Sequence, residues 1–192
     1  VVSVAKTNSR EAASDMDAIR DYAVSLALFD GESNVGALEI NISCPNTYGG
    51  EPFTTPERLD MLLTAVDALE LVKPVFIKMP ISVDMKTFRQ LIDVAAEHTV
   101  AGVTIGNLRK DRENVELKDE LPKSVKGNLS GAPNRDISTK LVRDTYKRYS
   151  DRLIIIGVGG IFNAEHAYEK IKAGATLVEM ITGVIFEGPQ IV

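Results

Sequence analysis

Short apolar runs alternate with amphipathic helical patterns along this chain, and that alternation restricts the possible folds more than any other feature. The runs are rich in Val, Ile and Leu with little polar alternation, as is typical of strands covered on both faces. The segments between them keep apolar residues on one helical face and end at recognisable caps, such as Gly174. The predicted strands are residues 1–4, 37–42, 74–79, 102–105, 153–158 and 177–181.

This repeated strand–helix order predicts an α/β protein with a parallel sheet. An open doubly wound sheet and a (β/α)8 barrel both fit the pattern. The 192 residues suit one domain, and we expect its first helix to run from about Arg10. The segment from Asn107 to Asp136 is long and charged, so we expect it to be a loop that is either an active-site lid or disordered.

Composition and charge exclude several function classes. The formal net charge is −5 and the chain has no basic run, which argues against nucleic acid or an anionic membrane as a partner. No apolar stretch approaches the ~20 residues of a transmembrane helix, and the first residues show no signal-peptide pattern. These first residues read as the interior of a longer protein. The single cysteine excludes an internal disulfide, so we expect a cytoplasmic protein, and no metal site is predicted.

Cys44 follows the end of a predicted strand, where parallel α/β proteins carry their functional side chains. It lies in a loop between Asn41 and Asn46, although a single cysteine is more often a small buried apolar residue. A thiol titrates near ~8.5, so a modest shift would make it a usable base or nucleophile. His98 and His166 are distant in sequence and are interpreted as ordinary helix residues, so a Cys–His dyad is not supported.

Three asparagines and one lysine also lie at predicted strand ends. Asn41, Asn46 and Asn107 offer both hydrogen-bond donors and acceptors, which suits a planar ligand such as a pyrimidine. Lys78 is a charged residue within an apolar strand, where lysine is rare unless it is paired. It is either a strand-end lysine that reaches water or a charge held against an anionic ligand or an electron-rich ring.

Glycine-rich turns follow the last two predicted strands. Gly157-Val158-Gly159-Gly160 opens a helix, and Thr182-Gly183 follows the next strand. Backbone N–H groups at such turns bind phosphate, and barrels have a recurrent phosphate site after their last two strands. The two turns together therefore indicate a phosphate-bearing ligand.

These motifs, in this order, resemble those of the dihydroorotate dehydrogenases. The resemblance runs over nearly the whole chain, and the Asn-Ile-Ser-Cys-Pro-Asn element at 41–46 is its most specific part. The matching segments are residues 41–46, 77–78, 106–107, 129–131, 155–161, 173–178 and 182–183.

The resemblance implies a (β/α)8 TIM barrel that binds FMN and oxidises dihydroorotate to orotate in de novo pyrimidine biosynthesis. About six of the eight strands are present, as a single partial barrel over 1–192, with the family's first two strands and its final helix missing. Cys44 matches the base that takes the C5 proton while a hydride passes from C6 to the flavin, and Asn41, Asn46 and Asn107 match residues that hold the pyrimidine. Contacts to the flavin are implied for Asn41, Lys78, Ser130, Gly131, Gly159, Gly160, Thr182 and Gly183.

Some residues depart from the family pattern. Leu108 stands where a Ser or Thr usually touches the substrate, Asn128 replaces a glycine, and Ser3 replaces an asparagine of the quinone-linked type. The cysteine base is typical of the soluble type, whereas 129–131 and 151–192 are at least as similar to the quinone-linked type. The electron acceptor, whether fumarate, NAD or quinone, therefore stays open.

Three alternatives remain. One is a related FMN enzyme that acts on another dihydropyrimidine. Another is a non-catalytic barrel fragment that covers its open strand edges by forming a homodimer. The last is a phosphate-binding barrel isomerase, which would have no reason to keep Asn41, Cys44 and Asn46 together.

Overall fold

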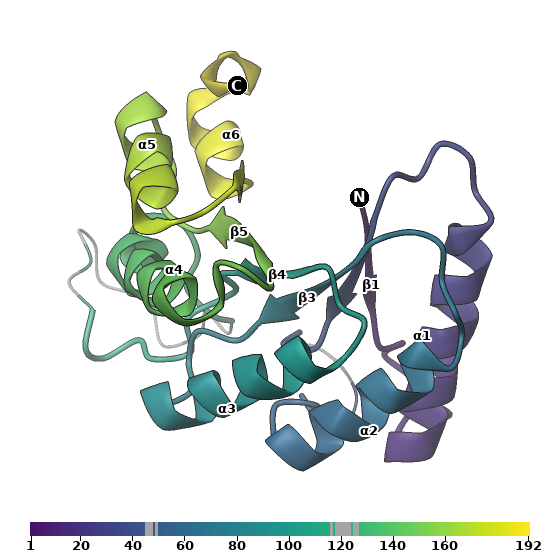
Figure 1. Cartoon of the computed structure of the whole chain (residues 1–192). Coiled ribbons are helices and arrows are strands. Elements are labelled where there is room, and N and C mark those ends of the chain that lie inside the picture. The colour runs from purple at the N-terminus through teal and green to yellow at the C-terminus, as the bar shows by residue number, and fades with distance from the viewer. Residues whose placement is uncertain (45–47, 49, 116, 118–123, 125–126) are drawn as a thin grey trace.

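Six parallel strands form a single curved sheet, a half-barrel with helices on its outer face (Figure 1). The computed structural model describes residues 1–44, 48, 50–115, 117, 124 and 127–192. The strands are hydrogen-bonded in chain order, which confirms the parallel α/β prediction and its barrel-type arrangement. They are β1 (Val2–Ala5), β2 (Leu38–Asn41), β3 (Val75–Met79), β4 (Gly102–Ile105), β5 (Ile154–Val158) and β6 (Leu177–Glu179).

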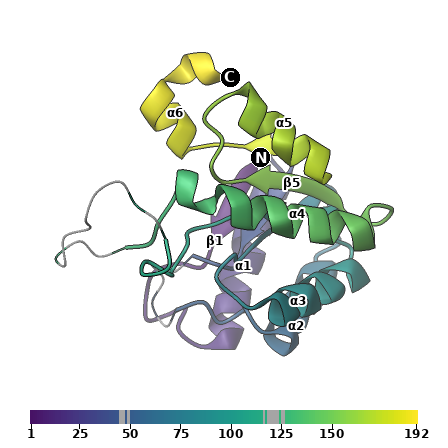
Figure 2. The same ribbon diagram turned by 90° about the vertical axis from the view of Figure 1, so that its left-hand side faces the viewer.

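The first five helices connect consecutive strands and follow one another around the outside of the sheet, whereas the sixth comes after the last strand (Figure 2). Among them, α4 packs between α3 and α5. The helices are α1 (Asp15–Asp30), α2 (Pro56–Asp67), α3 (Met85–Glu97), α4 (Arg135–Tyr149), α5 (Ala164–Ala173) and α6 (Thr182–Glu187), with short 3-10 turns at Ala132–Asn134 and Pro189–Ile191. Among the helices that the structure describes, none combines the length and apolarity needed to cross a bilayer.

Several predicted boundaries differ from the observed ones. The first helix begins at Asp15, not near Arg10, because the Ser14 hydroxyl accepts a hydrogen bond from the Asp17 N–H and starts the helix there. His98, interpreted from the sequence as a helix residue, lies just beyond the end of α3. The short helix α6 was not predicted, since it spans too few residues to show a helical period.

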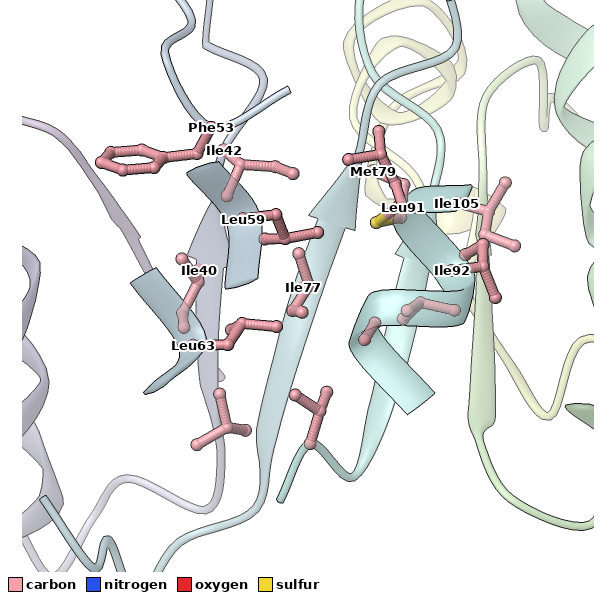
Figure 3. Packing of buried hydrophobic residues seen from close by; sticks show 14 of the residues in the cluster. Ile40, Ile42, Phe53, Leu59, Leu63, Ile77, Met79, Leu91, Ile92 and Ile105 are labelled. Atoms are coloured by element: carbon pink, nitrogen blue, oxygen red, sulfur yellow. The ribbon is translucent and has the colours of Figure 1, made fainter. Parts of the chain in front are cut away.

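The core lies between the sheet and the helices, because alternate strand residues point to opposite faces. Ile40, Ile77 and Ile105 point outward and pack against Leu59 and Leu91 (Figure 3). The residues between them in sequence point into the half-barrel, and many of these are polar. They include Glu39, Asn41, Lys78 and Thr104.

Lys170 joins α5 to α4 from within the core. Its side chain is fully buried, and its ammonium donates to the Arg135 carbonyl at 2.9 Å and to the hydroxyls of Ser138 and Thr139, each at 2.6 Å. Burial lowers the pKa of Lys170 to about 8, because removal from water disfavours the charged form.

We expect Lys170 to make the free energy of unfolding rise with pH between about 8 and 10.5. Below this window the lysine is charged in both states, and burying that charge opposes folding. Within it the unfolded chain still holds the proton that the folded chain has released, so stability rises by up to ~1.4 kcal/mol per pH unit. Urea unfolding between these pH values would measure the rise.

Lys170→Met should remove this contribution, whereas Lys172→Met should keep it, since Lys172 is exposed on the same helix. An equal rise in both variants would show that Lys170 is not its source.

Candidate functional site

The cavity that gathers most of the predicted residues lies at the carboxyl ends of β3 to β6. Its volume is about 210 Å3, and glycine and apolar residues make up most of its wall. Side chains and turns from separate segments meet here because parallel strands direct all their carboxyl ends to one edge. The predicted residues that line it are Lys78, Asn107, Ser130, Gly131, Gly159, Gly160, Thr182 and Gly183.

Two turns of the wall have space only for glycine. Gly160 has a φ of +73°, and a Cβ there would lie 2.4 Å from the Cβ of Arg135. Gly131 has a φ of +79°, and its Cβ would lie 2.7 Å from Cγ2 of Thr182. Both conformations disfavour any residue with a side chain. The Thr182 hydroxyl also donates to the Ser130 hydroxyl at 3.0 Å, so the two hydroxyls lie side by side at the cavity.

Two of the predicted asparagines meet across the end of β3. The Asn107 Nδ2 donates to Oδ1 of Asn41 at 3.2 Å and also to the Ser43 hydroxyl. The backbone of Asn41 is itself held by the Tyr22 hydroxyl, which donates to the Asn41 carbonyl at 2.8 Å. Asn46 lies outside the described residues, so only two of the three predicted amides are placed.

Cys44 directly follows Ser43 at the end of β2 and is half-buried. It lies close enough to Tyr22 that its charge adds to the rise in the tyrosine pKa, which burial chiefly causes. Neither Cys44 nor Asn41 is among the described residues that line the cavity. Asn41 is nevertheless hydrogen-bonded to Asn107, which does line it.

The two histidine rings are engaged elsewhere. His98 faces Asp67 through Nδ1 at 2.7 Å and Asp60 through Nε2 at 3.1 Å. The Nε2 of His166 lies 2.7 Å from Nη1 of Arg135. Both rings are thus bonded to residues of the helical layer.

Lys78 is paired with two carboxylates inside the half-barrel. Its ammonium lies 3.4 Å from Oε1 of Glu39 on β2 and 3.5 Å from Oε2 of Glu179 on β6. The Ser3 hydroxyl also donates to Oε1 of Glu39 at 2.6 Å. The side chain of Lys78 is 15% exposed and that of Glu39 only 2%, so the pair is largely shielded from water.

Neither acidic partner was predicted from the sequence, although a signal existed. Glu39 and Glu179 each interrupt an apolar strand, which is the same feature that marked Lys78. Burial and the charge of Glu39 raise the pKa of Glu179, while Lys78 opposes the rise. The second carboxylate oxygen of Glu39, Oε2, is buried without a hydrogen-bond partner among the described residues.

Two further residues complete the wall. Leu108 lines the cavity next to Asn107, so an apolar side chain borders the asparagine pair. Asn134 also lines the cavity and is almost fully buried at 2% exposure. Nothing in the sequence marks Asn134, because it lies in the segment expected to be a loop and belongs to no recognisable motif.

Comparison with known proteins gives one consistent family. The family model described as dihydroorotate dehydrogenase matches residues 2–192. Two curated relatives named dihydroorotate dehydrogenase (quinone) come from Acaryochloris marina and Rippkaea orientalis. The first is 35% identical over 180 residues, and the second is 32% identical over 182 residues. These alignments cover 91% and 92% of this chain but 48% of each relative, so the chain spans about half the length of the curated relatives it matches.

Solved structures agree with the sequence comparison. The ligand-free dihydroorotate dehydrogenase of Eimeria tenella is 30% identical, with a TM-score of 0.73 over 82% of this chain and 48% of that one. The complex of the Eimeria tenella enzyme with ferulenol is 27% identical, with a TM-score of 0.75 over 90% of this chain and 50% of that one.

Gly160→Ala should destabilise the chain by roughly 1–3 kcal/mol, because it combines a strained φ with a backbone clash. Gly127→Ala is the matched control, since Gly127 has a φ of +125° but no atom within 4 Å of its would-be Cβ. Urea unfolding would compare the two. Equal losses would mean that the contact with Arg135 is easily relieved.

Proposed function

The chain belongs to the dihydroorotate dehydrogenase family, and we propose that it acts in an FMN-dependent oxidoreductase that converts dihydroorotate to orotate in pyrimidine biosynthesis. The observation that carries the proposal is the meeting of two features at one sheet edge. A glycine-walled cavity follows β5 and β6, and a pair of facing asparagine amides follows β2 and β4. The first suits a phosphate-bearing cofactor and the second a planar polar ring.

The cavity residues fit FMN. Gly159, Gly160, Thr182 and Gly183 would hold the phosphate, because the turn after β5 and the start of α6 bring backbone N–H groups to the cavity wall. Ser130 and Gly131 would border the ring, with Asn41 and Lys78 at its polar edge. Bound FMN would supply the hydride acceptor, which no amino-acid side chain provides.

Asn41, Asn46 and Asn107 would hold the substrate. Their amides offer donors and acceptors in a plane, which match the carbonyl and N–H groups of a dihydropyrimidine. Asn107 and Asn41 already share a hydrogen bond of 3.2 Å, so their side chains are oriented toward one another before any ligand binds. Such preorganisation lowers the entropy cost of binding.

Cys44 would act as the base. A thiolate at this position would take the C5 proton of the substrate while C6 loses a hydride, so that the ring loses one proton to the thiolate and one hydride, with its two electrons, to the flavin. Positioned bases of this kind contribute ~10²–10⁴-fold to a rate. Its place beside Asn41 and Ser43, outside the cavity wall, leaves the cavity to the cofactor.

A second candidate is an FMN enzyme that acts on a different dihydropyrimidine. Leu108 favours it, because an apolar side chain borders Asn107 and cannot hydrogen-bond to a polar substituent of the ligand. Assays with dihydroorotate and dihydrouracil would separate the two substrates. The names of the relatives specify quinone, whereas the cysteine base favours a soluble acceptor, so quinone, fumarate and NAD would be tested in parallel.

A non-catalytic role is the competing proposal. β1 and β6 each have a single hydrogen-bonded neighbour, and two copies could cover these edges as a homodimer. We propose a cytoplasmic location in either case, from the single cysteine and the net charge of −5.

An absorbance spectrum with added FMN tests the proposal. We expect a bound flavin band near ~450 nm that dihydroorotate bleaches without air. Cys44→Ala should retain the band and lose turnover by ~10²–10⁴-fold. If the chain does not bind FMN, the cofactor assignment is wrong. If Cys44→Ala turns over as fast as the unchanged chain, Cys44 is not the base.

Lys78→Met should lower both FMN affinity and stability. Loss of a charged hydrogen bond should weaken binding about tenfold. The variant also leaves the buried carboxylate of Glu39 without its cation, which should cost ~3 kcal/mol of unfolding free energy.

The double variant Glu39→Gln/Lys78→Met separates these effects. We expect it to recover much of the stability without recovering the affinity, as measured by urea unfolding and FMN fluorescence titration. If the double variant also recovers FMN affinity, Lys78 does not bind FMN directly and serves only to neutralise the charge of Glu39.

A further inference from the structure

The amide of Asn134 joins two separate segments of the cavity wall. Its Nδ2 donates to the Asn107 carbonyl at 3.0 Å and to the Leu129 carbonyl at 3.1 Å. Asn107 follows β4, and Leu129 immediately precedes Ser130 and Gly131. A single side chain at the start of α4 therefore fixes both the asparagine pair and the turn that carries Ser130.

Leu129, which Asn134 holds, also pairs with Arg109 at the other end of the long connection after β4. The Arg109 N–H donates to the Leu129 carbonyl at 2.8 Å, and the Leu129 N–H donates to the Arg109 carbonyl at 2.8 Å. The Leu129 carbonyl thus accepts from both Arg109 and Asn134, and the two contacts support each other. Loss of the Asn134 donor should loosen this bridge.

A third wall segment packs directly on Asn134. A Cβ built on Gly159 would lie 3.2 Å from the Cβ of Asn134, so the turn after β5 rests against this side chain. Asn134 accordingly touches the ends of β4 and β5 and the turn before α4.

The orientation of the amide is determined by its partners. Both neighbours are carbonyl oxygens, so only the NH2 group can face them. The opposite atom, Oδ1, is then buried without a hydrogen-bond partner among the described residues. An apolar side chain of similar size would fill the same space without this cost, so the two donated hydrogen bonds are what an asparagine adds here.

We propose that Asn134 is the positioning residue of this site, which holds Asn107 and the Leu129–Gly131 turn in the geometry that the ligands require. It acts through Asn107 and Ser130, and it needs its two N–H donors to do so. The identity of the ligand rests on the proposed function, but the positioning role itself does not.

Asn134→Asp tests the proposal by changing the donors while keeping the shape. An ionised carboxylate would repel both carbonyls, whereas a protonated carboxyl can donate to one of them. Burial beside two carbonyls raises the pKa of the introduced group, so it should be protonated near pH ~5 and ionised near pH ~8. The effect of the variant should therefore depend on pH.

The readout that needs no ligand is hydrogen exchange at the Arg109 and Leu129 amides, each compared with the unchanged chain at the same pH. We expect exchange about tenfold faster near pH ~8 and a return to within about threefold near pH ~5. The dissociation constant for FMN, measured by fluorescence, should follow the same pattern.

Two further variants complete the test. Asn134→Leu should loosen the bridge at both pH values, with no recovery in acid, because it has no donor to regain. Asn163→Asp is the matched control, since Asn163 is an exposed helix cap where Asp serves equally well, and it should leave exchange unchanged.

The outcomes separate the two proposals. Exchange in Asn134→Asp that matches the unchanged chain at both pH values, or that rises equally at both, would overturn the positioning role. A chain that fails to bind FMN while the exchange pattern appears as expected would instead refute the cofactor assignment and leave the role of Asn134 supported.

Discussion

Parallel hydrogen bonding between consecutive strands is the constraint on which the site depends. The register places Asn41, Lys78 and Thr104 side by side on β2, β3 and β4, all pointing into the half-barrel. Because every strand runs in the same direction, the turns after β4, β5 and β6 also lie at this edge. A shift of one residue in β2 or β4 would turn its inward side chains toward the helices and separate the asparagine pair.

The inner face of the sheet can carry polar side chains because the apolar core lies on the outer face, which the helices cover. Ile40, Ile77 and Ile105 bury their side chains against the helices, which frees the alternate positions for polar residues. Three charged side chains nevertheless lie close together, with one cation between two carboxylates. Such a cluster adds little to stability, since desolvation offsets much of the attraction. Its value lies in the placement of a charged group at the edge of the cavity.

Much of the architecture was predictable because it depends on local sequence patterns, namely apolar runs, helical periodicity and helix caps. Apolar runs and helix caps predicted the element order, and the position of Asn41 and Asn107 at predicted strand ends indicated that both could hold one planar ligand. Glu179 was not recognised as a partner of Lys78, because β3 and β6 are not neighbours and approach each other only through the curvature of the sheet. Glu39 lies on the strand next to Lys78 and could have been found from its place within an apolar run. Asn134 could not have been found at all, since its contacts join segments that share no sequence pattern. The functional roles of Cys44, Asn46 and the flavin residues stay predictions.

The contact between Lys78 on β3 and Glu179 on β6 passes across the inside of the curved sheet, beyond the two strands β4 and β5 that lie between them. Backbone hydrogen bonds join only adjacent strands and allow the sheet to flatten or bend. A side-chain contact between β3 and β6 instead limits how far apart these two strands can lie. The raised pKa of Glu179 means that mild acid neutralises this carboxylate before an ordinary one. Lys78 itself lines the cavity, so this contact also ties the cavity wall at β3 to β6 across the inside of the half-barrel.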